Sequence, residues 1–556
     1  MNMWPLLSYL PQLVQQAEES SFLRQELGFV ILLTIAAGVA IFVRRFVKLP
    51  YTVALVLVGL VLSFFPNFLG FTISSDLILD LLVPPLVFEA TLQIKWSSLR
   101  RNLIPILLLA VVGVLISTLL VGEIVSQTLG IPLLAAVAFG ALISATDPVA
   151  VISFFRSLGV SKRLALLVEG ESLFNDGVAI VVFTLAVSLA ASTGEVTFNL
   201  VDFIIEFLRV AVGGLAVGIF LGLVVSQLVL RHVDDNLIET ATTVALAFGA
   251  FVLAEEFHLS GILAVVAAGL FVGNVGFINT SPTTRVTLEN FWEFLAFVTN
   301  SIIFLIIGLE VQLQQFGTNL IPIIVAVATI LLSRAVVVYA ITWISNRLDP
   351  RNFIPVNYRH IMFWGGLRGA ISLALALTLS NGVFDAFIVR ELQVMTFGVV
   401  LFTLLFQGLT IAPLIRRLGL SKRPENRLAQ QKEQGLLYMK QSGKRELDRL
   451  RDDGILPAEL WNAMARVYDD EIAQHDEELH RLLREHAELT QEIVLQARMD
   501  LLRAERTAAS DAFQRGLLTE EIFEELIRET DNRAAALDRI IAVQGLGPEA
   551  ESSLER

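Results

Sequence analysis

Four short motifs place ionisable side chains inside long apolar stretches of this sequence. They are VPPLVFEAT with Glu89, ATDPVAV with Asp147, EGESLFNDG with Glu171 and Asp176, and GGLRGA with Arg368. A charge at the depth of a lipid bilayer is costly unless it is paired or faces a cavity. These residues are therefore the candidates for chemistry. Their carboxylates, together with neighbouring hydroxyl and carbonyl oxygens, are the ligands of a hard cation.

The ATDPVAV motif predicts a break in a helix. Pro148 has no amide hydrogen, so the carbonyl of Ser144 loses its helical partner. Asp147 precedes the proline and is disfavoured in helical dihedrals. We expect the backbone to unwind near Thr146 and Asp147, where bare carbonyls lining a cavity would suit a hard cation. A simple proline kink is the alternative interpretation.

The EGESLFNDG motif predicts oxygen ligands on one helical face. At about 100° per residue, Ser172 and Asp176 share a face and Asn175 is adjacent. This face can look towards the break at Asp147. The resulting set contains only oxygen ligands, as Na⁺ or a similar hard ion prefers.

Glu171 is turned about 140° away from Asp176 and must contact a different neighbour. Inside the membrane it needs a cation, and Arg368 is the outstanding candidate. Arg334, in a later apolar stretch, is ambiguous, with a structural role favoured. Glu89 follows two prolines by one turn. It completes the polar cavity or stabilises neighbouring helices, and these two interpretations have equal weight.

Glu169 lies about two helical turns before Asp176 and nearly in line with it. It could draw cations into an inward funnel. An ordinary solvated residue at a helix end is an equally good interpretation, so the sequence leaves the role of Glu169 open.

Composition limits the classes of protein that could carry these motifs. Of 556 residues, 55% are hydrophobic and 17% charged, which excludes an ordinary cytosolic enzyme. The absence of cysteine excludes cysteine-based metal sites and thiol nucleophiles. From Pro424 onward the chain holds 29 acidic and 18 basic residues. Such an acidic segment argues against nucleic-acid binding.

Apolar runs long enough to cross a bilayer, about 20 residues each, recur through the first 423 residues. We count 13, at 27–43, 51–65, 76–94, 104–121, 132–155, 164–190, 201–230, 237–255, 260–278, 291–311, 320–346, 360–381 and 391–415. With the N-terminus outside, 18 Lys and Arg residues fall in inner loops and 2 in outer segments. Because basic residues accumulate in cytoplasmic loops, the split supports 13 spans and a cytoplasmic C-terminal tail.

The two halves of the membrane part have matching features. Gly365, Gly366 and Gly369 surround Arg368 and weaken helical preference, so a second broken helix is plausible in the twelfth span. The fifth and twelfth spans lie seven spans apart and run in opposite directions. That arrangement is expected of inverted repeats with a site at the bilayer midplane. We therefore expect an all-α membrane domain over 1–423 and a helical regulatory tail over 424–556.

Together, these motifs resemble the sodium/proton exchanger family, in its NhaP-like bacterial branch related to the eukaryotic NHE exchangers. The similarity rests on Thr146-Asp147-Pro148, Asn175-Asp176 and GGLRGAISLALAL, and extends to the tail segment LLRAERTAASDAFQRGLLTEEIFEEL. It implies a homodimer in which a six-helix core moves against a dimerisation domain. The Asn-Asp pair implies electroneutral exchange of one cation per proton.

The resemblance also implies a role for each candidate residue. The ion would be surrounded by the carboxylates of Asp176 and Asp147, the Thr146 carbonyl and the Ser172 hydroxyl. Asn175 would orient the site, Glu89 would contribute through water, and Glu171 would pair with Arg368.

The residues themselves indicate how exchange would work. A proton and a metal ion compete for the desolvated carboxylate of Asp176, and either one neutralises the site. We therefore predict a plasma-membrane Na⁺/H⁺ antiporter that is not an enzyme, uses no cofactor beyond the transported ions, and has a possible tail-binding regulator. Li⁺ as cargo, a K⁺/H⁺ antiporter, a cation channel and a membrane sensor remain alternatives.

Overall fold

The computed structural model describes residues 28–43, 45–46, 49–64, 77–191, 200–233, 235–310, 317, 319–379, 382–421, 425–485 and 487–543. Within these ranges every regular element is a helix. The chain divides into two compact units, Met1–Leu420 and Ser421–Arg556, close to the boundary expected at residue 423. The predicted outer N-terminal segment, residues 1–27, lies outside the described residues.

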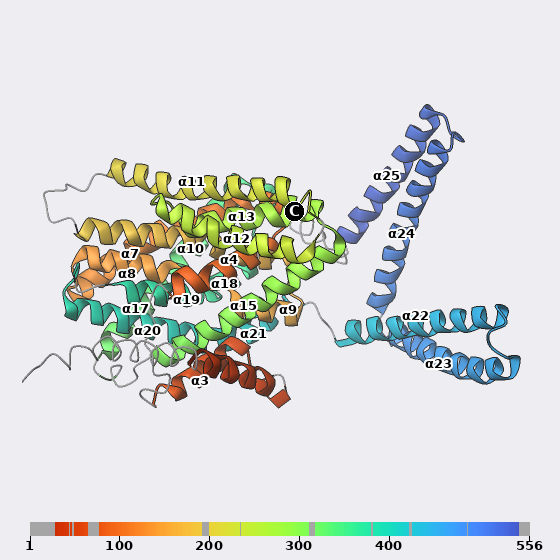
Figure 1. The fold of residues 1–556 in the computed structure, drawn as a ribbon, viewed down its shortest axis with the longest axis horizontal. Helices are drawn as coiled ribbons and strands as arrows, with labels where there is room; N and C mark the ends of the chain where they lie inside the picture. The colour runs from red at the N-terminus through yellow and green to blue at the C-terminus, as the bar shows by residue number, and fades with distance from the viewer. Residues whose placement is uncertain are drawn as a thin grey trace, which may run out of the picture. The chain divides into compact units, whose positions relative to one another are not determined.

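The first unit is a bundle of helices (Figure 1). After an apolar helix over Gly28–Val43 come α3 (Tyr51–Leu62), η1 (Leu77–Leu82), α4 (Val83–Leu92), α5 (Trp96–Arg101), α6 (Leu103–Leu107), η2 (Leu108–Gly113), α7 (Val114–Leu129), α8 (Leu133–Ser144), α9 (Val149–Leu158), α10 (Lys162–Ala191), α11 (Leu200–Val224) and η3 (Val225–Val229). Next are α12 (Asn236–Glu256), α13 (Gly261–Phe271), η4 (Val272–Gly276), α14 (Phe277–Asn279), α15 (Pro282–Glu310), α17 (Leu320–Leu348), η5 (Pro350–Asn352), α18 (Val356–Trp364), α19 (Ala370–Thr378), α20 (Ala386–Phe402), η6 (Thr403–Gln407) and α21 (Gly408–Arg417).

Most predicted spans coincide with a long apolar helix. Among the described residues, eight helices are long and apolar enough to cross a membrane, and three shorter apolar helices occupy 28–43, 51–62 and 261–276. The predicted spans at 76–94 and 360–381 fall instead on paired shorter elements, η1 with α4 and α18 with α19. The expected all-helical membrane fold is confirmed, and the count of 13 crossings stays a prediction.

The helices that frame the site are ended by glycine and packed through small residues. Gly130 and Gly159, with φ of 70° and 67°, end α7 and α9 in the left-handed conformation that glycine adopts without strain. On α8, a Cβ at Gly140 would lie 2.5 Å from the carbonyl oxygen of Thr118 on α7. This close approach packs α8 against α7, and α10 covers another side of α8.

The second unit consists of two helical hairpins. One pairs α22 (Glu425–Asp452) with α23 (Ala458–Glu485), and the other pairs α24 (Ala487–Gln514) with α25 (Glu520–Val543). Ion pairs cross the first hairpin, including Lys440 with Glu471 at 2.6 Å and His475 with Glu433 at 2.7 Å. These helices are amphipathic and rich in charge, in contrast to the apolar helices of the first unit.

Candidate functional site

Two interrupted helices meet through their unwound segments. Residues 145–148 separate α8 from α9, and residues 365–369 separate α18 from α19. The amide of Asp147 in the first segment donates a hydrogen bond of 2.8 Å to the carbonyl of Leu367 in the second. Both predicted breaks are therefore confirmed. They form one junction in which backbone groups freed by one break bind those of the other.

Arg368 closes the carboxyl end of α8. Its Nη1 donates to the carbonyl oxygens of Ser144 at 2.8 Å and Ala145 at 3.0 Å, and the residue is only 2% exposed. Its backbone amide donates to Thr403 Oγ1 at 3.1 Å, in the π-helical segment η6. The last carbonyls of a helix lack helical partners and carry partial negative charge. A guanidinium at this point satisfies and neutralises them.

On the other side, α10 holds the first break through polar side chains. Asn175 Oδ1 accepts from the amide of Thr146 at 3.1 Å, and Asn175 Nδ2 donates to Thr146 Oγ1 at 2.8 Å. The hydroxyl of Ser172 donates to the carbonyl of Thr146. All three residues are buried. The expected shared face of α10 is thus turned towards the break, and Asn175 fixes the backbone at Thr146.

The two carboxylates of the site differ in how they are held. Asp147 Oδ1 accepts from the amide of Val149, the first residue of α9, at 2.9 Å. Its Oδ2 lies over Gly369, where an added Cβ would be 2.1 Å away. Asp176 has Asp147 and Arg368 among its charged neighbours, and no hydrogen bond to its carboxylate is found among the described residues. The carboxylate oxygens of Asp176 are therefore available to bind another group.

The predicted pairing of Glu171 with Arg368 is wrong, because Glu171 pairs with Arg334 of α17. Arg334 Nη1 contacts Oε1 and Nη2 contacts Oε2 at 2.8 Å, a two-pronged geometry between side chains that are 8% and 1% exposed. Arg334 Nη2 also donates to the carbonyl of Met362 near the end of α18. The physical reason is that the Arg368 guanidinium already donates hydrogen bonds to the carbonyls at the end of α8.

A glycine makes room for this ion pair. A Cβ at Gly366 would lie 2.7 Å from Nε of Arg334. The Gly-rich segment of the second break therefore admits two close neighbours, Arg334 at Gly366 and Asp147 at Gly369. Close backbone approach is what the three glycines around Arg368 predict, and here it is confirmed.

Glu89 lies in a different polar group from Asp176. Its carboxylate accepts from Gln93 Nε2, and Gln93 Oε1 accepts from Arg156 at 3.3 Å. Glu169 of α10, Arg156 of α9 and Glu293 of α15 are its charged neighbours. The structure therefore brings Glu89 together with Glu169, about two turns along α10 from Asp176. Glu89 stands outside the hydrogen-bonded network that joins Asp147 to Asn175.

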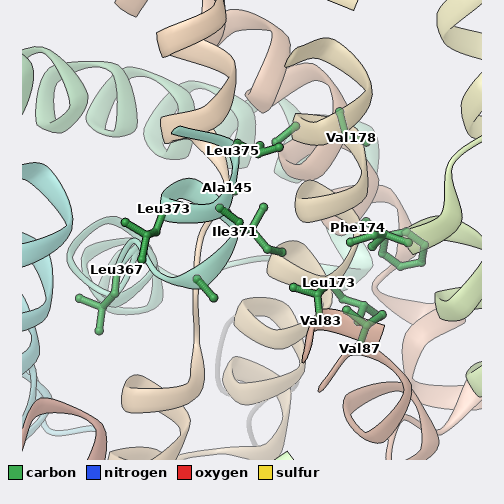
Figure 2. Close-up of a cluster of buried hydrophobic side chains, with 14 of the residues drawn as sticks. Val83, Val87, Ala145, Leu173, Phe174, Val178, Leu367, Ile371, Leu373 and Leu375 are labelled. Carbon is green, nitrogen blue, oxygen red and sulfur yellow. The ribbon is translucent and has the colours of Figure 1, made fainter. Parts of the chain in front are cut away.

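Buried apolar side chains surround the junction of the two breaks. Figure 2 shows a single cluster drawn from α4, α10, the first break and the second interrupted helix. Its labelled members are Val83, Val87, Ala145, Leu173, Phe174, Val178, Leu367, Ile371, Leu373 and Leu375, each less than 9% exposed. Such surroundings lower the effective dielectric constant, so charges in the site interact more strongly than in water.

The predicted ligands of the cation all carry oxygen atoms, and their role stays a prediction. The Asp147 and Asp176 carboxylates, the Thr146 carbonyl and the Ser172 hydroxyl come from one break and one face of α10. The sequence does not single out Thr403 or the carbonyls of Leu367 and Met362. Backbone carbonyls and helical threonines are too common to be recognised as partners before the helices are placed.

The chain is similar to known proteins over its whole first unit. Residues 30–417 match the family model described as sodium/hydrogen exchanger, transmembrane. The Na⁺/H⁺ antiporter ApNhaP of Aphanothece halophytica is 40% identical over 396 residues, which cover 70% of this chain and 74% of that protein. The Na⁺/H⁺ antiporter NhaG of Bacillus atrophaeus is 32% identical over 531 residues, which cover 93% of this chain and 98% of the relative.

A solved structure shares the fold. The sodium proton antiporter MjNhaP1 from Methanocaldococcus jannaschii matches with a TM-score of 0.59 at 21% identity, covering 72% of this chain and all of that chain. At this level of identity the likeness concerns the arrangement of the helices. It agrees with a multi-pass membrane architecture for the first unit.

Proposed function

This chain belongs to the sodium/hydrogen exchanger family, and from that premise we propose that it exchanges Na⁺ for H⁺ across a membrane, with Asp176 as the carboxylate that both cargoes share. The observation that carries the proposal is the frame around Asp176. Asn175 and Ser172 bind the unwound backbone at Thr146, while Arg368 neutralises the adjacent carbonyls. The Asp176 carboxylate itself is left without a protein hydrogen bond among the described residues.

Each ligand of the ion has a structural basis in this frame. Asp176 supplies a free carboxylate, and Asp147 supplies Oδ2, because its Oδ1 is held by the amide of Val149. The Thr146 carbonyl has a second lone pair beyond the one that Ser172 uses. The Ser172 hydroxyl can present its oxygen to a cation while it donates its hydrogen to Thr146. Oxygen ligands of this kind suit Na⁺ and disfavour softer metals.

Competition between the two cargoes produces exchange. A proton on Asp176 removes the negative charge that binds Na⁺, and a bound Na⁺ removes the charge that attracts a proton. Either load neutralises a carboxylate that lies among apolar side chains, and an unneutralised carboxylate is unfavourable there. The change between inward and outward access therefore occurs with one load or the other.

The remaining roles follow from the same premise. Asn175 orients the break, and Arg368 and the Glu171–Arg334 pair hold the two interrupted helices in place. Glu89 contributes through water from its neighbouring polar group. The Asn175-Asp176 pair implies, through the resemblance to the family's electroneutral branch, that one cation is exchanged per proton. The protein acts as a homodimer in the plasma membrane, and the helices after residue 423 form a cytoplasmic regulatory tail.

A flux assay tests the proposal. The purified protein is reconstituted in vesicles that contain a pH-sensitive dye, and Na⁺ is added at clamped voltage. The parent protein moves protons in response to Na⁺, whereas Asp176→Asn does not. Asp202→Asn, the same change at an exposed position at the start of α11, retains the parental rate. Na⁺-dependent proton movement by Asp176→Asn at the parental rate would refute the assignment.

A further inference from the structure

A half-open pocket of about 500 Å³ lies between α17, α18 and α21, and none of its lining residues belongs to the candidate site. Its walls are mainly aromatic and aliphatic, and the lining also includes the imidazole of His360 and the guanidinium of Arg417. The residues that matter here are Tyr339, Phe363, Trp364, Leu414, His360 and Arg417. An apolar pocket with a few polar groups is the usual form of a small-molecule site.

The pocket walls present apolar surface. The ring of Phe363 lies 6.1 Å from that of Tyr339 and 5.9 Å from that of Trp364, measured between centroids. The indole nitrogen of Trp364 donates to Thr410 Oγ1 at 2.8 Å. Because this polar atom already has its partner, the wall offers an occupant only hydrophobic contact.

Arg417 brings a positive charge to the lining of the pocket. Arg417 is the last residue of α21 and is exposed. Among the described residues no carboxylate forms an ion pair with Arg417. Nδ1 of His360 lies 2.5 Å from the hydroxyl of Tyr339, which orients the imidazole at the pocket. The guanidinium of Arg417 suits an anionic group, and phosphate is a common partner of arginine.

Exposed aromatic side chains lie close to the lining residues of the pocket. Phe406, which is 53% exposed, contacts Trp364 edge-on at 6.1 Å between centroids. On α17, Trp343 is 55% exposed, and Arg347 lies 4.9 Å over its ring. Tryptophan and arginine together mark the level where apolar chains meet polar headgroups. Because Trp343 and Arg347 follow the lining residue Tyr339 by about one and two turns of α17, this level of a bilayer would lie near the pocket.

We propose that this pocket binds an anionic phospholipid, with its phosphate at Arg417 and an acyl chain along Phe363, Trp364 and Leu414. The charge of Arg417 matches the phosphate, and the aromatic wall matches the chain. Such an occupant would hold α18 against α21. Since α18 leads into the second break, and its Met362 carbonyl binds Arg334, the lipid would steady one wall of the transport site.

Native mass spectrometry of the purified full chain tests the proposal. Dioleoyl phosphatidylglycerol, dioleoyl phosphatidylcholine and glycerol phosphate are titrated separately. The parent binds phosphatidylglycerol more tightly than phosphatidylcholine, and Arg417→Gln weakens phosphatidylglycerol binding roughly fivefold. The control is Arg416→Gln, an exposed neighbour that does not line the pocket, and it keeps the parental affinity.

A second pair of variants tests the apolar wall. Leu414→Trp fills the pocket and lowers phosphatidylglycerol binding, whereas Leu409→Trp, exposed on the same helix outside the lining, does not. Equal affinity for the two lipids, equal losses in Arg416→Gln and Arg417→Gln, or equal losses in the two tryptophan variants would overturn the proposal. Glycerol phosphate binding as tightly as the lipid would identify a free-anion site instead.

Discussion

The amide of Asp147 binds the carbonyl of Leu367 at 2.8 Å, and this hydrogen bond joins the unwound segments of two different helices. Ser372 Oγ adds a second link across the same junction, to the carbonyl of Leu142 at 2.7 Å. A displacement of one interrupted helix is therefore transmitted to the other. Asp147 thus contacts both interrupted helices. Its backbone amide binds Leu367 in the second break, and its side chain binds the amide of Val149 at the start of α9.

The Glu171–Arg334 pair is expected to stabilise the fold strongly. Arg334→Ala leaves a buried carboxylate without its cation, and Glu171→Gln leaves a buried guanidinium without its anion. Removing one partner of a buried pair costs about 3–5 kcal/mol. We expect both variants to unfold at clearly lower temperature or denaturant concentration in detergent. The measurement is thermal or chemical unfolding of the purified protein.

An exposed ion pair provides the matched control. Arg209 and Glu206 on α11 are 2.9 Å apart, with side chains 55% and 40% exposed. Pairs of this kind contribute about 0–1 kcal/mol, so Arg209→Ala should unfold close to the parent. If Arg334→Ala proved as stable as Arg209→Ala, the structural role of the buried pair would be contradicted.

Local chemistry predicted the breaks but not the partner of Glu171. Pro148 removes a backbone donor wherever the chain folds, so unwinding near Asp147 follows from the sequence alone. A helical wheel, in contrast, gives the direction of Glu171 and not which helix lies there. Two arginines were available. Choosing between Arg334 and Arg368 requires knowing that the guanidinium of Arg368 reaches the end of α8, a contact between distant segments.

Arg368 is expected to stabilise the first break directly. In Arg368→Gln the carbonyls of Ser144 and Ala145 lose a charged donor, so the segment 145–149 should open more often. Hydrogen bonds to charged groups contribute about 1.5–3 kcal/mol, which predicts amide exchange in this segment faster by roughly tenfold or more. Hydrogen–deuterium exchange measures it. Arg359→Gln, the same change on the preceding helix α18, serves as control, and unchanged protection at 145–149 in Arg368→Gln would count against the role.

Gly369→Ala is expected to weaken cation binding without a change of charge. The added Cβ would lie 2.1 Å from Asp147 Oδ2, so the carboxylate must move. Binding groups work within about 0.5 Å of their productive position, and we expect the apparent KM for Na⁺ to rise roughly tenfold. The readout is the Na⁺ dependence of proton flux in vesicles.

A second glycine supplies the comparison. Gly249 on α12 has no atom within 4 Å of an added Cβ. Gly249→Ala should keep the parental KM and gain about 0.5–1 kcal/mol of stability, because alanine loses less backbone entropy in a helix. A Gly369→Ala variant with the KM of Gly249→Ala would show that the Asp147 carboxylate is not held by this contact.

The central claim is that Na⁺ and H⁺ compete for Asp176, and calorimetric titration of Na⁺ across a range of pH tests it most directly. The account predicts a dissociation constant that rises about tenfold for each unit by which the pH falls once the site takes up a proton, with one proton released for each Na⁺ bound. Asp176→Asn should lose both the binding and the proton release. Na⁺ binding to the parent with the same affinity at every pH, and with no proton released, would contradict the account.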